Sequence, residues 1–306
     1  MEIVQTAEPL RGKYPFVTVG TYDGIHLGHQ EILRRLVGQA REAGLPSCVI
    51  TFSPHPQQVV APSFHLKLLT TLKEKADFLA TRGVDYLYVL RFGLRFRNLG
   101  YEEFIKKFLV DGLKVKKVLI GFDHSFGYRR SGQAPILKIL GKKYGFAVEV
   151  VNPVLVEGMI VKSSVIRTLL LKGQVKLAGI LLGRPYRLEG EVIKGSRRGH
   201  RVLFPTANLR LPAEKLIPAD GVYVGKVFAE SGEYPAVINV GRRPTFGGRR
   251  RWVETYLLEF EKELYGEKIR VDFLDYLREE TKFFSVGELQ HQIEKDVLRA
   301  REILRG

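Results

Sequence analysis

The sequence predicts an α/β chain in two parts: a parallel-sheet domain over residues 1–183, then a small antiparallel β-barrel domain with a C-terminal helix over 184–306. Three observations predict this fold class. Short apolar runs alternate with helical patterns in the first part, as in βαβ units. Strand-like runs separated by turns follow in the second part, as in a small barrel. One amphipathic helical pattern then closes the chain.

The first part contains five short, β-branched runs, each of a length typical of a buried strand. They are FVTVG (16–20), SCVITF (47–52), DYLYVLRF (85–92), KKVLIG (116–121) and AVEVV (147–151). Helical patterns lie between them, the first of which begins near His29. Two more are LKEKADFLATRG and EEFIKKFLVDGL, which end near a glycine. Parallel sheets collect their ligands at the carboxyl ends of the strands, so we expect the site at that edge.

The second part changes pattern near residue 184. A linker leads into a strand within GRPYRLEGEVIKG, and further strands are predicted at GVYVGKVFA, YPAVINVG, WVETYLLEF and KIRVDFLDYL. Apolar residues at helical spacing then predict a helix over about 285–304 that covers an edge or face of the barrel. The arginine-rich stretch RRPTFGGRRR (242–251) is predicted to be a flexible basic loop.

Charge and composition narrow the class of protein. The formal net charge is +16, which favours an anionic partner, either nucleic acid or phosphorylated small molecules; a solvated basic surface is the plainer alternative. No apolar run approaches the ~20 residues of a membrane span, and the N-terminus has no secretory pattern. The single cysteine, Cys48, cannot form an internal disulfide. We therefore expect a cytoplasmic protein without membrane contact.

The stretch GTYDGIHLGH (20–29) joins the first strand to the first helix. Unpaired amides at a helix start attract anions, and glycines let a phosphate approach the backbone closely. His26 and His29 lie three residues apart, on one face of the first turn, and can donate hydrogen bonds to one triphosphate. A zinc site would need further ligands, and the usual glycine patterns of P-loops and dinucleotide sites are absent. A histidine pair without function stays open at this point.

These residues resemble the H-x-G-H signature of the nucleotidylyltransferase superfamily. TFSPHP (51–56), GFDHSFGYRRSG (121–132) and VKSSVIRTLLLKGQVKLAGILLGRPY (161–186) follow in order. Together they are similar to the adenylyltransferase half of bacterial bifunctional riboflavin kinase/FMN adenylyltransferases, also called FAD synthetases. The resemblance implies a Rossmann-like nucleotidylyltransferase domain in which the FMN phosphate attacks the α-phosphorus of ATP, releasing pyrophosphate and giving FAD. His124 and Ser125 stand where the family usually has Phe and Arg.

The resemblance also implies residue roles. His26, His29 and Arg167 are the expected catalytic residues, with Arg167 on the β- and γ-phosphates. The ATP-binding residues implied are Gly20, Thr21, Asp23, Gly24, Gly28, Ser163 and Ser164. His55 and Asp123 are the expected contacts to the other substrate. From residue type alone, the two serines read equally as a helix cap. The nucleophile is already an anion, so positioning and charge stabilisation should carry the reaction without a base.

A second motif, PTAN, lies in the barrel part. Thr206 and Asn208 flank Ala207 just after Pro205, and residues two apart in an extended segment point the same way. Two neutral oxygen ligands on one side can hold Mg²⁺ together with nucleotide oxygens. The structural alternative is a proline-initiated turn that uses Asn208 as a turn residue.

PTAN is the signature of riboflavin kinases, and GVYVGKV, VINVGRRPTFGG and VETYLLEFEKELYGEKIRVDFLDYLREETKF accompany it as in that family. The resemblance implies Glu254 as general base toward the riboflavin 5′-hydroxyl. It implies Mg²⁺ on Thr206 and Asn208, and an ATP site made by Gly195, Gly199, Pro205, Thr206 and Asn208. Alternatively, Glu254 is an outward polar strand residue, and Glu259 is a rival by residue type. The basic stretches are either flaps over ATP or solvated loops.

The sequence thus predicts a two-domain transferase that phosphorylates riboflavin to FMN and adenylylates FMN to FAD. Its expected partners are riboflavin, FMN, FAD, ATP, ADP and pyrophosphate, with Mg²⁺ and ATP at both sites and no nucleic acid. Two alternatives remain: a chain that retains one of the two activities, and a basic nucleic-acid-binding protein with a degenerate nucleotide site.

Overall fold

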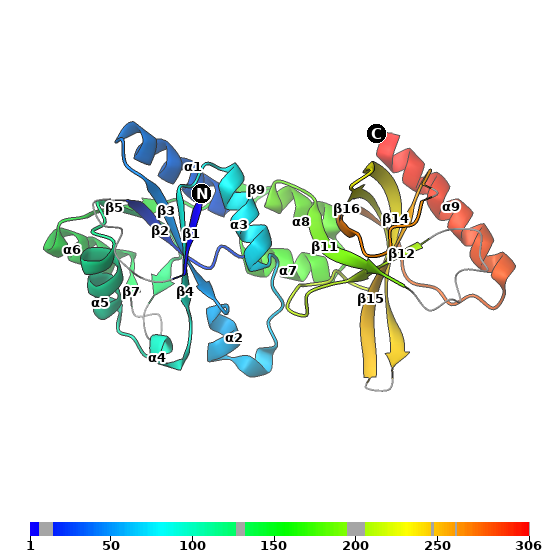
Figure 1. Ribbon diagram of the computed structural model, residues 1–306, viewed down its shortest axis with the longest axis horizontal. Coiled ribbons are helices and arrows are strands. Elements are labelled where there is room, and N and C mark those ends of the chain that lie inside the picture. Colours follow the sequence, from blue (N-terminus) through cyan, green and yellow to red (C-terminus); the bar gives the residue numbers. More distant parts are fainter. Residues whose placement is uncertain (6–14, 127–131, 195–205, 246–247, 261, 306) are drawn as a thin grey trace. The chain divides into compact units, whose positions relative to one another are not determined.

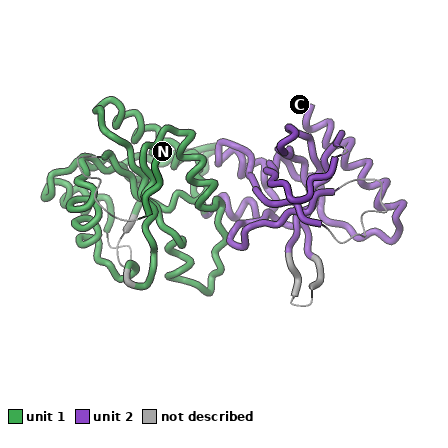
Figure 2. Tube along the Cα trace, in the orientation of Figure 1, with its two compact units in different colours: residues 1–163 green, residues 164–306 purple. Residues whose placement is uncertain are grey.

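The computed structural model describes residues 1–5, 15–126, 132–194, 206–245, 248–260 and 262–305. The chain divides into two compact units, Met1–Ser163 and Ser164–Gly306 (Figure 2). The boundary expected after residue 183 stays a prediction. Within the described ranges, no helix is both long enough and apolar enough to cross a membrane.

The first unit is built on a six-stranded parallel sheet (Figure 1). Its order is β1 (Glu2–Val4), β4 (Tyr86–Arg91), β3 (Ser47–Ser53), β2 (Phe16–Val19), β5 (Lys117–Gly121) and β8 (Ala147–Val151). The five expected strands are confirmed, and β1 adds an edge strand too short to leave a pattern. From β2 the chain adds β3 and β4 on one side, then β5 and β8 on the other. The order reverses between β2 and β5, which is where open α/β sheets bind ligands.

Helices connect these strands. They are α1 (Leu27–Glu42), α2 (Pro56–Val60), α3 (Leu72–Thr81), α4 (Leu94–Arg97), α5 (Tyr101–Phe104) and α6 (Ala134–Tyr144). The helix expected over 102–113 is α5 continued by a π-helical segment, η2 (Ile105–Gly112). Short pieces complete the unit: η1 (Pro62–Phe64), β6 (Ser125–Phe126), β7 (Gly132–Gln133), β9 (Leu155–Val156) and β10 (Met159–Ile160).

Both faces of the sheet are buried. On β4, Tyr86 and Tyr88 join a core that includes residues of α5, η2 and α6, whereas Leu87 points to a core formed with α1 and α3. Burial on both sides explains why these strands read as continuous apolar runs instead of alternating ones.

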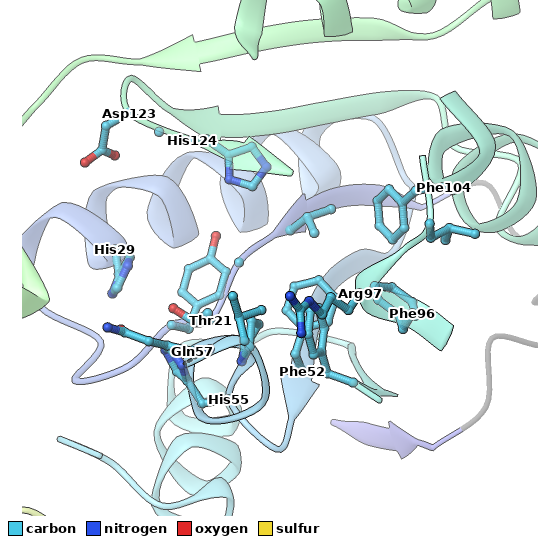
Figure 3. Close-up of a pocket in the computed structure, with 18 of the residues that line it drawn as sticks. Thr21, His29, Phe52, His55, Gln57, Phe96, Arg97, Phe104, Asp123 and His124 are labelled. Atoms are coloured by element: carbon cyan, nitrogen blue, oxygen red, sulfur yellow. Dashed lines mark hydrogen bonds between the residues drawn. The ribbon is translucent and has the colours of Figure 1, made fainter. Parts of the chain in front are cut away.

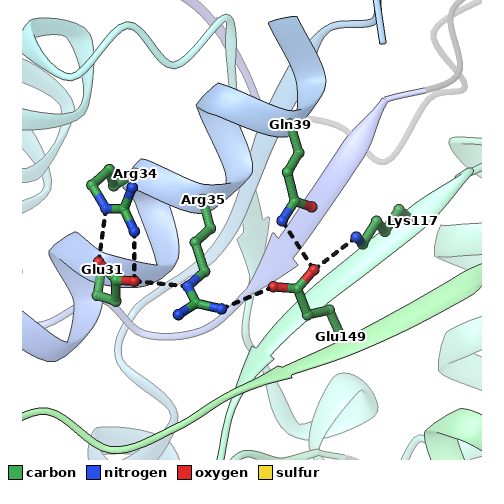
Figure 4. Close-up of polar contacts among 6 residues, drawn as sticks. All are labelled: Glu31, Arg34, Arg35, Gln39, Lys117 and Glu149. Carbon is green, nitrogen blue, oxygen red and sulfur yellow. Dashed lines mark hydrogen bonds and ion pairs between the residues drawn. The ribbon is translucent and has the colours of Figure 1, made fainter. Parts of the chain in front are cut away.

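A polar network fixes α1 to the edge of the sheet (Figure 4). Glu149 on β8 accepts hydrogen bonds from Lys117 at 2.7 Å and from Gln39 of α1 at 3.0 Å. Arg35, also on α1, reaches the same carboxylate at 3.4 Å. Partial burial acts to raise the pKa of Glu149, but these donors outweigh it and hold the pKa below its ordinary value. The network thereby orients the helix that has His26 as its N-cap and His29 in its first turn.

The second unit is a closed antiparallel barrel (Figure 1). Around the barrel the strands are β11 (Tyr186–Ile193), β12 (Thr206–Arg210), β15 (Gly248–Leu257), β14 (Gly232–Thr245), β13 (Gly221–Ala229) and β16 (Lys268–Arg278). Helices α7 (Ser163–Leu171) and α8 (Val175–Leu182) precede it, and α9 (Val286–Arg305) follows it. The expected strands and the expected closing helix are confirmed, and Thr206–Asn208 lie in strand β12.

Close strand packing and a helix complete the barrel. A Cβ added at Gly225 would lie 2.2 Å from the carbonyl oxygen of Asp272, so only glycine lets β13 and β16 approach as they do. The last turns of α9 pack on an outer face of the barrel. The cluster there comprises Val222, Val224, Val237, Leu277 and Ala300, with Val297, Ile303 and Leu304 against it.

The prediction of a flexible loop over 242–251 is wrong. Strand β14 continues to Thr245, and β15 resumes at Gly248, its ladder partner. The stretch contains a Gly-Gly pair, which is a hairpin signal, and the charge run concealed it. Ion pairing accommodates two of the arginines: Arg242 and Arg251 both bind Asp220, at 2.9 and 2.6 Å.

Candidate functional site

The turn after β2 has a strained backbone. Tyr22 and Ile25 have left-handed φ angles of 49° and 37° and are almost fully buried. Non-glycine residues persist in this region only where the surroundings determine their conformation. The hydroxyl of Tyr22 lies 2.5 Å from that of Thr18, which is one such restraint.

Asp23 supplies the second restraint. Its carboxylate is 2 % exposed and accepts hydrogen bonds from the backbone N–H groups of Leu69 and Thr70, at 3.2 and 3.0 Å. The N–H of Gly24 donates to the Thr70 hydroxyl at 3.0 Å. At the start of α7, the Ser163 hydroxyl donates to the carbonyl of Asp23 at 2.8 Å. Asp23, Gly24 and Ser163 therefore hold the shape of the turn.

His26 is the N-cap of α1. Its Nδ1 accepts the N–H of His29 at 3.3 Å, so in the neutral ring the hydrogen is on Nε2. The two imidazoles stack, with ring centroids 3.7 Å apart. A Cβ at Gly28 would lie 3.2 Å from the His26 ring, and one at Gly20 would lie 3.0 Å from the Tyr22 ring. Both glycines therefore make room for rings of the protein itself.

His29 lies beside a cavity and has one unsatisfied nitrogen. Its Nδ1 is buried and has no hydrogen-bond partner within the part of the chain that the structure describes. Burial, then the charges of His26 and Lys75, hold the pKa of His29 well below its ordinary value. The imidazole is therefore neutral at physiological pH, with an unused nitrogen that a ligand can satisfy.

The cavity has a volume of about 730 Å³ and opens at the carboxyl ends of the parallel strands, as expected (Figure 3). In this view His29, Thr21 and Asp123 lie toward one end, and Phe96, Phe104 and Arg97 toward the other. The apolar end is a cluster of rings: Phe96 lies 5.6 Å from Phe52 and 5.9 Å from Phe104, centroid to centroid. One end is thus polar, and the other suits a large aromatic group.

Five of the expected residues line this cavity: Gly20, Thr21, His29, His55 and Asp123. His55 also caps α2, since its Nδ1 accepts the N–H of Gln57 at 3.1 Å. Asp123 forms an ion pair with Lys162 at 3.2 Å, and His124 lines the cavity beside it. Ser164 and Arg167 belong to the other compact unit, and their roles stay predictions.

Sequence reasoning missed Lys75. It lies on α3, is 6 % exposed, and donates to the carbonyl oxygen of Thr21 at 2.5 Å. Burial lowers the pKa of Lys75 to about 8, although the charge of Asp23 acts in the opposite direction. The available signal was its position: Lys75 falls on the apolar stripe of α3 beside Ala76 and Leu79, where a lysine is unusual. The aromatic end of the cavity was missed too, because its rings come from separate segments.

In the barrel, Thr206, Asn208 and Glu254 meet. Asn208 and Glu254 are direct partners in the β12–β15 ladder. The Thr206 hydroxyl donates to Glu254 Oε1, and the Asn208 amide donates to the same oxygen at 3.4 Å. The expected shared direction of Thr206 and Asn208 is confirmed.

The remaining predictions for the kinase site concern Glu259 and three residues of the expected ATP site. Glu259 does not share the strand of Glu254, contrary to expectation, because β15 ends at Leu257; Glu259 instead contacts Arg301 of α9 at 3.2 Å. Gly195, Gly199 and Pro205 lie outside the described residues.

The donor chemistry of the barrel cluster fits a hard cation. The described ranges contain no group of three or more His, Cys, Asp or Glu residues that could hold a metal. At the barrel cluster, Glu254 accepts the Thr206 hydroxyl hydrogen and an Asn208 amide hydrogen, so the oxygen lone pairs of both residues remain available. Neutral oxygens oriented by a neighbouring carboxylate suit Mg²⁺ that also borrows phosphate oxygens.

Comparison with known proteins gives two family matches in one chain. The FAD synthetase model matches residues 11–165, and the riboflavin kinase model matches residues 182–304. A bifunctional riboflavin kinase/FMN adenylyltransferase of Haemophilus influenzae is 38% identical, covering 93% of this chain and 92% of its own. The enzyme of that name from Pseudomonas fluorescens is 37% identical over 99% and 98% of the two chains.

One solved structure covers the whole fold. The crystal structure of a protein described as a macrolide-efflux protein from Streptococcus pneumoniae has a TM-score of 0.89, with 34% identity and 98% coverage of both chains. The two family matches and the two relatives agree. The chain belongs to the bifunctional riboflavin kinase/FMN adenylyltransferase family, with its FAD synthetase region first and its riboflavin kinase region second.

Proposed function

We propose that the barrel unit phosphorylates riboflavin with ATP, giving FMN and ADP, and that the parallel-sheet unit adenylylates FMN with ATP, giving FAD and pyrophosphate. One observation carries this proposal: a single chain holds both the His29 cavity and the Thr206–Asn208–Glu254 cluster. The proposal includes Mg²⁺ as cofactor, a cytoplasmic location, and the expected domain boundary between residues 183 and 184.

In the adenylyltransferase, the two ends of the cavity bind different parts of the substrates. The rings of Phe52, Phe96 and Phe104 offer an apolar surface for the isoalloxazine ring system of FMN. Toward the polar end, the unsatisfied Nδ1 of His29 gains a partner when phosphate arrives, and His26, which stacks on the His29 ring, holds that ring in place. The FMN phosphate is already anionic, so these groups align it with the α-phosphorus of ATP and stabilise shifting charge without removing a proton.

In the kinase, Glu254 removes a proton. A hydroxyl nucleophile gains from a base, by a factor of typically ~10²–10⁴. Glu254 takes the proton of the riboflavin 5′-hydroxyl while that oxygen attacks the γ-phosphorus of ATP. Thr206 and Asn208 hold Mg²⁺, which offsets the negative charge of the phosphates when it is bound. The same carboxylate orients both ligands, so Glu254 has two duties.

The test is to incubate the protein with riboflavin, ATP and Mg²⁺ and to separate the flavins over time. We expect FMN first and FAD later. Product that stops at FMN would leave one activity, and salt-sensitive nucleic-acid binding without flavin turnover would favour the basic-protein alternative.

Two variants assign the activities to sites. His29→Ala should abolish FAD formation and leave riboflavin phosphorylation intact. Glu254→Gln should abolish phosphorylation, while FMN supplied from outside is still adenylylated. Each variant is the folding control of the other. Loss of both activities in either variant would show that the two sites are not independent, and normal phosphorylation by Glu254→Gln would remove Glu254 as the base.

A further inference from the structure

We propose that Lys75 is a positioning residue for FMN adenylylation: its ammonium group holds the Thr21 carbonyl and places a positive charge behind the phosphate end of the cavity. The inference rests on the proposed adenylyltransferase function.

Three elements converge on the Thr21 carbonyl. Lys75 of α3 donates to this oxygen at 2.5 Å and to the hydroxyl of Thr51, at the end of β3, at 3.1 Å. Thr51 in turn donates to the same carbonyl at 3.2 Å. Thr21 lines the cavity and directly precedes the strained Tyr22. Lys75 therefore fixes the backbone where the β2 strand becomes the phosphate-binding turn.

The charge of Lys75 is costly for folding, which indicates a use elsewhere. A buried ammonium loses its hydration, and lysines are almost never fully buried. Its neighbours on the same face of α3, Ala76 and Leu79, belong to an apolar core that a methionine would complete. The lysine also acts beyond its hydrogen bonds, because its charge helps to keep His29 neutral. A positive charge buried behind an anion-binding site attracts the anion more strongly than it would in water.

The charged and titratable groups that interact with Lys75 in the described part of the unit are Asp23, in the turn, and His29 of α1. Asp23 is committed to the N–H groups of Leu69 and Thr70, so it offsets the lysine charge without capturing it. Because burial lowers the pKa of Lys75 to about 8, the ammonium is mostly present at pH 7 and mostly lost by about pH 9. FMN adenylylation should therefore decline as pH rises through about 8.

The experiment compares Lys75→Met, Lys75→Arg and wild type in full-length protein, with FMN and ATP as substrates. Lys75→Met removes the charge and should lower kcat/KM for FMN adenylylation about 10–100-fold, as misplacement of reacting groups by a distant substitution can do. It should also remove the decline above about pH 8. Lys75→Arg keeps the charge and should retain more activity at pH 7. Riboflavin phosphorylation, measured in the same samples, should stay unchanged.

Lys73→Met is the matched control, since Lys73 lies on the same helix with its side chain 67% exposed. It should change neither activity. Calorimetry of each variant checks that the first unit still unfolds cooperatively. Equal losses in Lys75→Met and Lys75→Arg, or a pH profile that Lys75→Met leaves unaltered, would overturn the role of the charge. If the wild-type protein makes no FAD, the proposed adenylyltransferase function itself is refuted. Failure of that function and failure of the Lys75 role are therefore distinguishable.

Discussion

Replacing Asp23 by asparagine tests whether this carboxylate holds the turn in place. The wild-type side chain accepts two backbone N–H bonds, at 3.2 and 3.0 Å, and lies 3.4 Å from the Thr70 hydroxyl. Asparagine is nearly the same size but keeps only one acceptor oxygen. The backbone N–H of either Leu69 or Thr70 then faces the side-chain NH2 group of asparagine, which cannot accept its hydrogen bond.

The magnitude follows from those contacts. A hydrogen bond to a charged group contributes about 1.5–3 kcal/mol, and a buried donor left unsatisfied costs about 1–3 kcal/mol. Some of this loss is offset because a buried charge disappears. We therefore expect Asp23→Asn to lower the unfolding free energy of the first unit by about 2–4 kcal/mol. For a unit of this size, that corresponds to a fall in Tm of about 5–15 °C.

Calorimetry of the full-length protein measures the effect, with each transition assigned by which activity is lost after heating. Asp77→Asn is the control, because Asp77 is an exposed carboxylate of α3 that pairs across the helix surface with Lys73. Asp23→Asn should also remove the charge that supports the pKa of Lys75, so FMN adenylylation should decline at a lower pH than in wild type. A Tm within 2 °C or so of the Asp77→Asn value would refute the reasoning.

Three further predictions concern the scaffold. Glu149→Gln should cost about 1 kcal/mol at pH 7. Because the folded pKa of Glu149 lies below its ordinary value of 4.5, this difference should shrink as pH falls below 4.5 and vanish once the pH is below the folded pKa, which a series of Tm measurements from pH 7 into strong acid will show. Gly225→Ala should abolish folded kinase, since its Cβ meets the Asp272 carbonyl at 2.2 Å; soluble, active protein would contradict this. A fragment of residues 164–306 should phosphorylate riboflavin and unfold at a higher temperature than 185–306; equal Tm values would count against a structural role for α7 and α8.

Local patterns carried most of the fold prediction. Five strands, the closing helix and the edge of the sheet at which the cavity lies follow from periodicity and from the rule for parallel sheets. Periodicity does not register a three-residue edge strand such as β1, and a run of arginines obscured the hairpin arms of β14 and β15. Strand order depends on contacts between distant segments, which no single stretch encodes.

The site was predictable where its residues are neighbours in sequence. His26 and His29 belong to one helical turn, and Thr206 and Asn208 to one strand, so spacing alone places each pair on one side. Lys75 reaches Thr21 only because α3 shares a core with α1, β3 and β4, and Glu254 meets Asn208 only through the register of β12 with β15. Such convergence is set by tertiary packing.

In the segment between the two family matches, the boundary predicted from the sequence pattern and the boundary between the compact units fall at different residues. Helical periodicity persists to Gly183, so the sequence places the boundary there, whereas the compact units part after Ser163. The packing of α7 and α8 explains this difference. Near the end of α7, Leu170 accepts the N–H of Ala219 at 2.9 Å. Gly173, which follows, lies against the Tyr276 ring, and a Cβ added there would come within 3.2 Å of that ring.

Helix α8 continues the same contact, since Lys176 reaches Asp275 of β16 at 3.6 Å and the helix packs against β11 and β16. Residues 164–183 thus cover part of the barrel, although their sequence pattern continues that of the parallel-sheet region. A cut at residue 184 would expose the barrel surface that α8 covers, and burial of apolar surface is the main source of stability in a unit this small. In packing, residues 164–183 therefore group with the barrel. The domain boundary proposed between residues 183 and 184 instead follows the sequence, since the riboflavin kinase match begins at residue 182. Ser163, the first residue of α7, is the exception, because it belongs to the parallel-sheet unit and its hydroxyl holds the turn after β2 there.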